Sequence, residues 1–348
     1  MLYVTTRSET QIFTPQYALR EQRGPDGGIF IPYNLIPYTH EELTALEQLS
    51  FNECLAAGLN RFLRAKISGQ DLDMYCGRNP VRYRLVSRKI LIAECCRNSD
   101  GTFSRFARDV GRVVCSDKSV DSSCTPLLDT IVRATVLIAL YFEIRRLGII
   151  TQGETFDVSA VAGDFFSPVG ILLVRHMGLP VENIVCCCNE NSAVWNLFHQ
   201  GEFRPNVRCV PTPIPEADVI IPDGLEAYIR LTTGTGETER FLDAIREGRA
   251  YFPCADSLDR MRKGLHVSVV STSGILNTIP NVYSTSGILL SSHSALAYAG
   301  LLDYRARTKE SRYGLVLAEK SSSADLTPVS RALNISQSKL TEILKTID

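Results

Sequence analysis

The sequence predicts an α/β fold with a mainly parallel sheet. From Lys89 onwards, short and continuously apolar segments alternate with helical patterns, which is typical of parallel strands covered by helices. The chain has 348 residues, 45% hydrophobic and 22% charged, which allows a substantial core. Residues 125–147 are apolar on most sides of a helix that ends in Arg145 and Arg146 before Gly148, so we expect a buried helix.

The expected strands carry the functional prediction, because parallel sheets bind ligands beyond the carboxyl ends of their strands. We therefore expect the ligand-binding residues directly after each strand. The expected strands are residues 90–93, 158–162, 184–188 and 314–318, and two further helices are expected at 168–177 and 192–199.

The first part of the chain has a different pattern, which suggests a division into residues 1–88 and a large α/β domain at 89–348. A dense turn signal, GPDGG at residues 24–28, precedes a short strand at 29–31. Residues 41–62 have apolar positions at helical spacing. The polar stretch 271–275, STSGI, is expected to be a loop.

Charge and composition narrow the class of partner. Net charge is −1 and the 37 basic residues are scattered, so we expect no nucleic-acid partner. The most apolar stretch, residues 134–142, is too short to span a bilayer and the start lacks a secretion signal. We therefore expect a cytoplasmic protein that does not associate with a membrane. The cysteine runs 95–96 and 186–188 place neighbouring thiols on opposite faces of a strand, which predicts buried, reduced cysteines and no metal.

Several segments, spread in order along nearly the whole chain, resemble the motifs of one family. The segment GPDGGIFIP at residues 24–32 is similar to APDGGLYVP, and MGLP at 177–180 with NEN at 189–191 is similar to MGLPI and TNEND. In these segments the chain resembles bacterial-type threonine synthase, a pyridoxal-phosphate enzyme of fold type II. Supporting segments are LYVTTR at 2–7, GEFRP at 201–205 and HSALAY at 293–298.

The resemblance implies a lysine that forms a Schiff base with the cofactor aldehyde. The family's stretch ELFHGPTLAFKD matches residues 94–105, ECCRNSDGTFSR. Phe103 keeps the family phenylalanine, and Ser104 stands where the lysine is expected. Serine cannot form an imine, so the resemblance predicts loss of the cofactor linkage.

The resemblance also implies a cradle for the cofactor phosphate, the family loop GNFGN before a helix. The matching residues are Gly163, Asp164, Phe165, Phe166 and Ser167. Asp164 puts a carboxylate where a dianion would lie, and Phe166 replaces the second glycine. Either Asp164 itself takes the anion position or it faces solvent. Ser167 and Pro168 are expected to be the N-cap and first residue of the helix.

Two further family features differ. The threonine that contacts the pyridine nitrogen corresponds to Glu319, which we expect to be a surface charge after a strand. A mobile subdomain, which the family inserts before a helix whose arginine matches Arg133, is reduced here to residues 106–125. The predicted fold is thus that of a fold type II enzyme with the small subdomain largely deleted.

These changes favour a catalytically inactive homologue, a pseudoenzyme with a scaffold, binding or sensing role and no expected cofactor. The alternative is a pyridoxal-phosphate-dependent lyase with a relocated lysine, for which Lys118 is the outside candidate and Lys89 a surface charge. A third hypothesis is another enzyme in the same cleft. The expected partners are a small amino-acid-like or phosphorylated ligand, a protein partner or a second copy of the chain.

Overall fold

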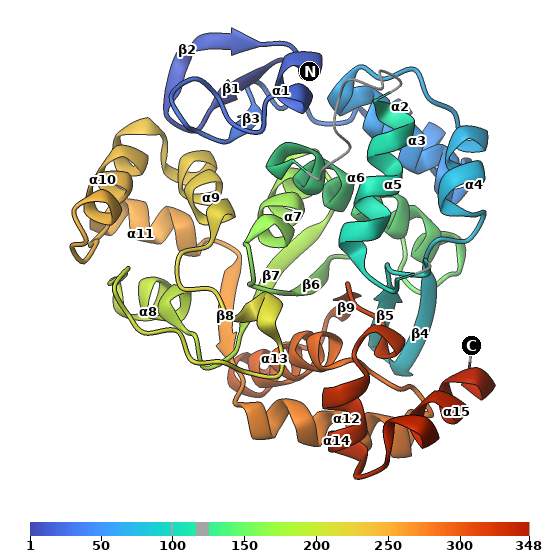
Figure 1. Cartoon of the computed structure of the whole chain (residues 1–348). Helices are drawn as coiled ribbons and strands as arrows, with labels where there is room; N and C mark the ends of the chain where they lie inside the picture. The colour runs from blue at the N-terminus through green and yellow to red at the C-terminus, as the bar shows by residue number, and fades with distance from the viewer. Residues whose placement is uncertain (99, 116–124, 348) are drawn as a thin grey trace.

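The computed structural model describes residues 1–98, 100–115 and 125–347, and Lys118 lies outside them. Its centre is a six-stranded sheet of order β4-β5-β9-β6-β7-β8 (Figure 1). All neighbours pair in parallel except the edge strand β4, which forms an antiparallel pair with β5. The strands are β4 Arg82–Ser87, β5 Ile90–Glu94, β6 Phe156–Val161, β7 Val181–Cys188, β8 Leu265–Val269 and β9 Tyr313–Ala318.

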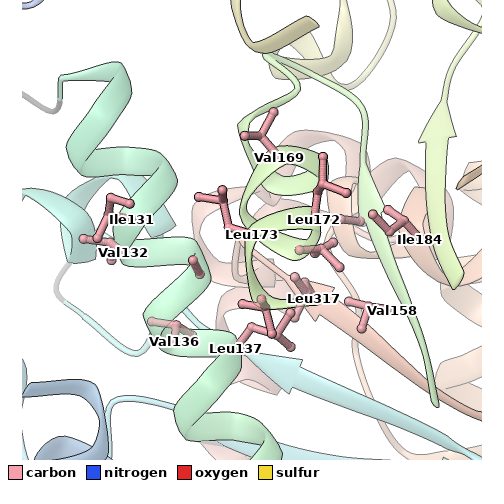
Figure 2. Packing of buried hydrophobic residues seen from close by; sticks show 14 of the residues in the cluster. Ile131, Val132, Val136, Leu137, Val158, Val169, Leu172, Leu173, Ile184 and Leu317 are labelled. Carbon is pink, nitrogen blue, oxygen red and sulfur yellow. The ribbon is translucent and has the colours of Figure 1, made fainter. Parts of the chain in front are cut away.

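Helices cover both faces of this sheet, as the sequence predicts. The long helix α6, Pro126–Arg146, and α7, Phe166–His176, pack together on one face, and Figure 2 shows Leu137 of α6 and Leu173 of α7 on the sides that the two helices turn toward each other. On the other face lie α12, Thr272–Ser286, and α13, Ser292–Thr308. Strand residues alternate between two buried clusters, with Leu91 facing the α6 side and Ile92 the α13 side.

The N-terminal part forms its own small antiparallel sheet, of order β2-β1-β3. Its strands are β1 Tyr3–Thr5, β2 Ser8–Phe13 and β3 Phe30–Pro32, with α1 Pro15–Arg20 between the last two. The helical spacing expected at 41–62 corresponds to helical structure with one interruption. Two helices form, α2 His40–Glu47 and α3 Phe51–Leu63, because the Ser50 side chain caps α3 and exchanges hydrogen bonds with Glu53.

The remaining helices surround the sheet (Figure 1). The stretch expected as a loop at 271–275 instead begins α12, since Ser271 accepts a hydrogen bond from the Gly274 amide and caps the helix. The boundary suggested after residue 88 falls in the hairpin that joins β4 to β5. The other helices are α4 Gly69–Cys76, α5 Phe103–Val114, α8 Ala193–Gln200, η1 Pro215–Ala217, α9 Asp223–Thr233, α10 Thr235–Arg246, α11 Ala255–Arg262, η2 Ser322–Ala324, α14 Leu326–Leu333 and α15 Gln337–Ile347.

The predicted buried helix is confirmed in detail. Helix α6 is capped by the Thr125 side chain, ends at Arg146, and buries most of its residues. Residues 115–125 join α5 to α6. In the part of the chain that the structure describes, no strand lies between these two helices. Among the described residues, no helix combines the length and apolar character that crossing a bilayer requires.

Candidate functional site

A cavity of about 400 Å³ lies at the carboxyl ends of three adjacent strands, β5, β9 and β6. Its volume lies in the range of small-molecule sites. The segment after β5 contributes Ser104, the segment after β6 contributes Asp164 and Ser167, and the segment after β9 contributes Glu319. The position agrees with the strand-end rule.

The structure brings together most of the residues that the resemblance singled out. Ser104, Gly163, Asp164, Ser167 and Glu319 all line the cavity, and Arg133 reaches it from α6. Phe165 and Phe166 are buried and do not line it. Lys89 is exposed, donates a hydrogen bond to the Ser311 carbonyl, and lies outside the cavity.

Arg133 is the centre of a buried ion network. Its Nε donates to the Ser167 hydroxyl at 2.6 Å and to Glu319 at 3.2 Å, and its guanidinium also pairs with Asp129 one helical turn away. Its planar group lies 4.5 Å from the centre of the Phe103 ring. Burial opposes the charge, but Asp129 and Glu319 outweigh it and hold the pKa of Arg133 well above its ordinary value.

Glu319 is therefore not the surface charge that the sequence suggests. Its side chain is only 9% exposed, and its carboxylate accepts hydrogen bonds from Arg133 and, at 2.6 Å, from Ser167. Burial alone would raise the pKa of Glu319, yet the Arg133 charge outweighs burial and lowers it. The sequence does not indicate this pairing, because Arg133 lies 186 positions away from Glu319 along the chain.

The start of α7 also differs from the expected Ser167 cap. The N-cap residue is Phe165, with φ of 69°, and the Asp164 carboxylate accepts a hydrogen bond of 3.0 Å from the Phe166 amide. Ser167 is not free to cap, because its hydroxyl serves Glu319 and Arg133. Of the two alternatives for Asp164, this geometry corresponds to a carboxylate at the helix start.

Phe165 adopts a left-handed conformation that is unfavourable for an aromatic residue. Its ring stacks with Phe198 at 6.4 Å and meets Tyr228 edge-on at 5.4 Å. Gly224 at the start of α9 is equally constrained, since a Cβ there would lie 2.7 Å from the Phe165 carbonyl carbon. Its amide donates to the Asp164 carbonyl at 2.8 Å, so α9 holds the loop from outside.

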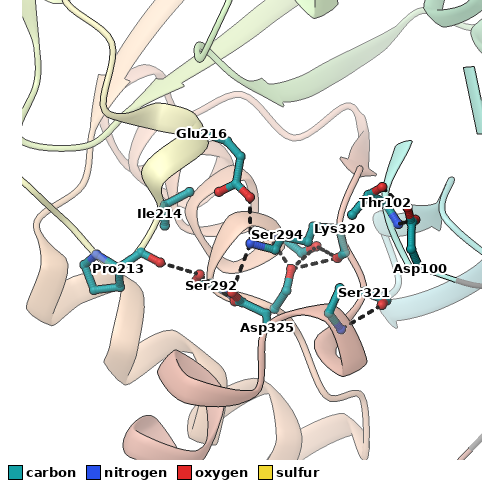
Figure 3. Close-up of polar contacts among 12 residues, drawn as sticks. Asp100, Thr102, Pro213, Ile214, Glu216, Ser292, Ser294, Lys320, Ser321 and Asp325 are labelled. Carbon is teal, nitrogen blue, oxygen red and sulfur yellow. Dashed lines mark hydrogen bonds and ion pairs between the residues drawn. The ribbon is translucent and has the colours of Figure 1, made fainter. Parts of the chain in front are cut away.

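A lysine lines the same cavity, although the sequence reasoning overlooked it. Lys320 donates a hydrogen bond of 2.7 Å to Glu216 and lies 3.3 Å from Asp325, as Figure 3 shows. Burial opposes the ammonium, but these two carboxylates outweigh it and raise the pKa of Lys320. The signal was available, because Lys320 directly follows Glu319 at the end of β9. Glu216 comes from η1 and has no comparable signal.

His293 and Asp164 stand out for what they lack. His293 is 7% exposed, lines the cavity from the first turn of α13, and its Nδ1 makes no hydrogen bond within the described part of the chain. Burial lowers its pKa, so the ring is neutral at neutral pH. Asp164 has no ion pair among the residues described, and burial raises its pKa to about 6.

The overall architecture is shared with solved threonine synthases. The chain matches the pyridoxal-phosphate-bound threonine synthase of Brucella melitensis with a TM-score of 0.78 at 17% identity, over 95% of this chain and 91% of that one. The yeast enzyme matches with a TM-score of 0.81 at 14% identity, over 99% and 94%. The fold is thus that of the fold type II pyridoxal-phosphate enzymes, as the resemblance implied.

Sequence comparisons point to one family within that fold. Residues 2–79 match the model for the threonine synthase N terminus. Threonine synthase-like 1 from Homo sapiens is 24% identical over 160 residues, 45% of this chain and 22% of that protein. The mouse protein is 24% identical over 203 residues, 57% and 26%. The chain therefore spans about a quarter of the length of the curated relatives that it matches, and it is similar to threonine synthases in its N-terminal segment and to threonine synthase-like 1 over about half of its length.

Proposed function

We propose that this chain is a threonine-synthase-like protein that does not carry out Schiff-base chemistry and uses the cavity for binding. The observation that carries the proposal is the buried network of Arg133, Ser167 and Glu319 in the cavity. Arg133 Nε, the Ser167 hydroxyl and the Glu319 carboxylate bond to one another, so these groups are already engaged without a charged cofactor.

The residues present do not fit pyridoxal phosphate. In the matched positions, Ser104 offers a hydroxyl instead of an amine, and Asp164 holds a carboxylate at the α7 start where a phosphate dianion would lie. The Asp164 carboxylate and a phosphate bound at the same helix start would repel each other. We therefore propose that no cofactor is linked to the chain and derive no reaction step through it.

A second candidate function has one observation in its favour. Lys320 lines the cavity, so a relocated lysine could serve a lyase related to threonine synthase. Its pairing with Glu216 and Asp325 opposes this role, because an ammonium with a raised pKa is a poor nucleophile. Lys118 stays the other candidate, outside the described residues.

The deciding experiment adds pyridoxal phosphate to the purified chain and follows the visible absorption of an imine. Borohydride reduction and peptide mapping then locate any adduct. We expect no adduct beyond the level seen at the exposed Lys89. A stoichiometric adduct at Lys320 that disappears in Lys320→Arg, but persists in the control Lys89→Arg, would establish the lyase-type site instead, and an adduct at Lys118 would do the same.

A further inference from the structure

We propose that the cavity binds a small organic molecule through a protonated amine, which the Asp164 carboxylate and the His293 imidazole receive. The inference rests on the proposed function, because it requires a cavity without a cofactor. Both groups line the cavity; His293 Nδ1 has no hydrogen-bond partner among the described residues, and the Asp164 carboxylate accepts one hydrogen bond from the Phe166 amide but forms no ion pair there. A carboxylate and a neutral imidazole can both accept hydrogen bonds, and an ammonium offers three donors.

The charges in the cavity favour a cation over an anion. Its two strong cations are already neutralised, Arg133 by Asp129 and Glu319, and Lys320 by Glu216 and Asp325. Asp164 is left without an ion pair among the described residues. An anionic ligand would have to separate buried pairs and would also face Asp164, whereas an ammonium compensates a carboxylate that forms no ion pair among the described residues.

A metal ion is a poorer match for the same charge. The described residues contain no group of three or more histidine, cysteine, aspartate or glutamate side chains placed to hold one. Zinc sites in proteins take three or four such ligands. The cavity volume of about 400 Å³ is instead that of a small metabolite, with Val161 and Phe103 supplying apolar wall.

The test compares three probes that share a four-carbon chain and a hydroxyl and differ at the other end: 4-amino-1-butanol, butane-1,4-diol and 4-hydroxybutyrate. Inorganic phosphate is the fourth probe. Calorimetry with the full chain at neutral pH should show the amine binding at least about tenfold more tightly than the diol. Failure of the amine to exceed the diol, or better binding of 4-hydroxybutyrate or phosphate, overturns the inference.

Variants locate the binding. Asp164→Asn keeps the size and the acceptor for the Phe166 amide but removes the charge, so it should abolish the preference for the amine. The control Asp256→Asn changes an exposed carboxylate on α11, far along the chain, and should leave the preference intact. An unchanged preference in Asp164→Asn contradicts the assignment.

Two outcomes keep the inference separable from its premise. If Asp164→Asn does not fold, the ranking of the four probes on the unmodified chain still decides, and His293→Phe then tests the location. A trapped pyridoxal-phosphate adduct refutes the proposed function. Absence of both adduct and amine preference refutes only the inference about the amine.

Discussion

Arg133 links three elements through side chains alone. It lies on α6, while Ser167 belongs to α7 and Glu319 follows β9. The side chains of Arg133 and Glu319 are 8% and 9% exposed, so water screens their interaction little. Buried pairs of this kind contribute little net stability when complete, but removing one partner leaves an uncompensated charge.

We therefore expect Arg133→Met to lower the free energy of unfolding by about 3 kcal/mol. The matched control is Arg246→Met, which removes the arginine of an exposed pair with Asp243 on α10. Urea unfolding should show no measurable loss for that variant. Equal effects of the two substitutions would contradict the buried network as a structural unit.

Asp164 should make stability depend on pH in an unusual direction. Burial raises the pKa of its carboxyl to about 6, against the attraction of Arg133 and with Asp129 and Glu319 adding repulsion. The folded chain thus holds this proton more tightly than the unfolded chain. The contribution of Asp164 to stability is therefore favourable at low pH and is lost as pH rises from 3.8 to about 6.

Replacing that carboxyl by a neutral amide should remove the penalty. Without ligand, Asp164→Asn is expected to be more stable than the parent chain at neutral pH, by about 1–2 kcal/mol after allowance for partial exposure. The difference should vanish below pH 3.8. Urea unfolding at several pH values, with Asp256→Asn alongside, checks this. A difference that does not change with pH would show that Asp164 does not titrate as described.

At the scale of elements, the decisive contact is between α9 and the loop that begins α7. Gly224 lets the α9 backbone approach Phe165 and Asp164 closely, since a Cβ at this position would lie 2.7 and 2.8 Å from their backbone atoms. Backbone atoms cannot yield as a flexible side chain would. The position of Asp164 at the cavity therefore depends on a glycine 60 residues further along the chain.

Gly224→Ala is expected to lower the free energy of unfolding by about 2 kcal/mol, the cost of overpacking. Gly236→Ala in α10 is the matched control, because a Cβ there meets nothing within 4 Å. Alanine favours the helix, so the control should be neutral or stabilising by up to about 1 kcal/mol. A chemical denaturation series compares the two. A neutral Gly224→Ala would mean that the loop can move away from α9.

At the scale of the whole molecule, residues 1–88 and 89–348 share one core. Leu55 and Phe62 of α3 belong to the same buried cluster as Ile131 and Leu137 of α6. A polar link adds to this, as Arg7 donates to Glu226 at 3.0 Å across 219 positions. The pairing of β4 with β5 also joins the two parts in one sheet.

We expect the two parts to unfold together. Fluorescence of Trp195, the single tryptophan, reports on α8 in the second part, whereas far-UV circular dichroism reports on all helices. The two signals should give the same urea midpoint, and Glu226→Gln should shift both equally. Separate midpoints would support the division at residue 88 as two independent folding units.

Local sequence patterns predict the strands and the main helices, because apolar periodicity and capping residues are signals that extend over only a few residues. The apolar run of α6, with Thr125 at its start and Gly148 after its end, is an example. The break before α3 has a local signal too, because Ser50 and Glu53 form a capping box. The residues of the cavity were named in part, since family motifs marked Ser104, Asp164 and Glu319. Their contacts were not, because Arg133, Glu216 and His293 come from distant segments.

The sequence by itself determined the α/β class, the buried helix α6 and the placement of chemistry after strand ends, because periodicity and capping are local properties. Only the tertiary structure decided the state of each charge. It made Glu319 a buried partner of Arg133, gave Lys320 two carboxylates, left Asp164 without an ion pair and left His293 Nδ1 without a hydrogen bond in the described chain. Charge states depend on burial and on neighbours within a few ångströms, and parallel strands bring such neighbours together from positions far apart in the chain.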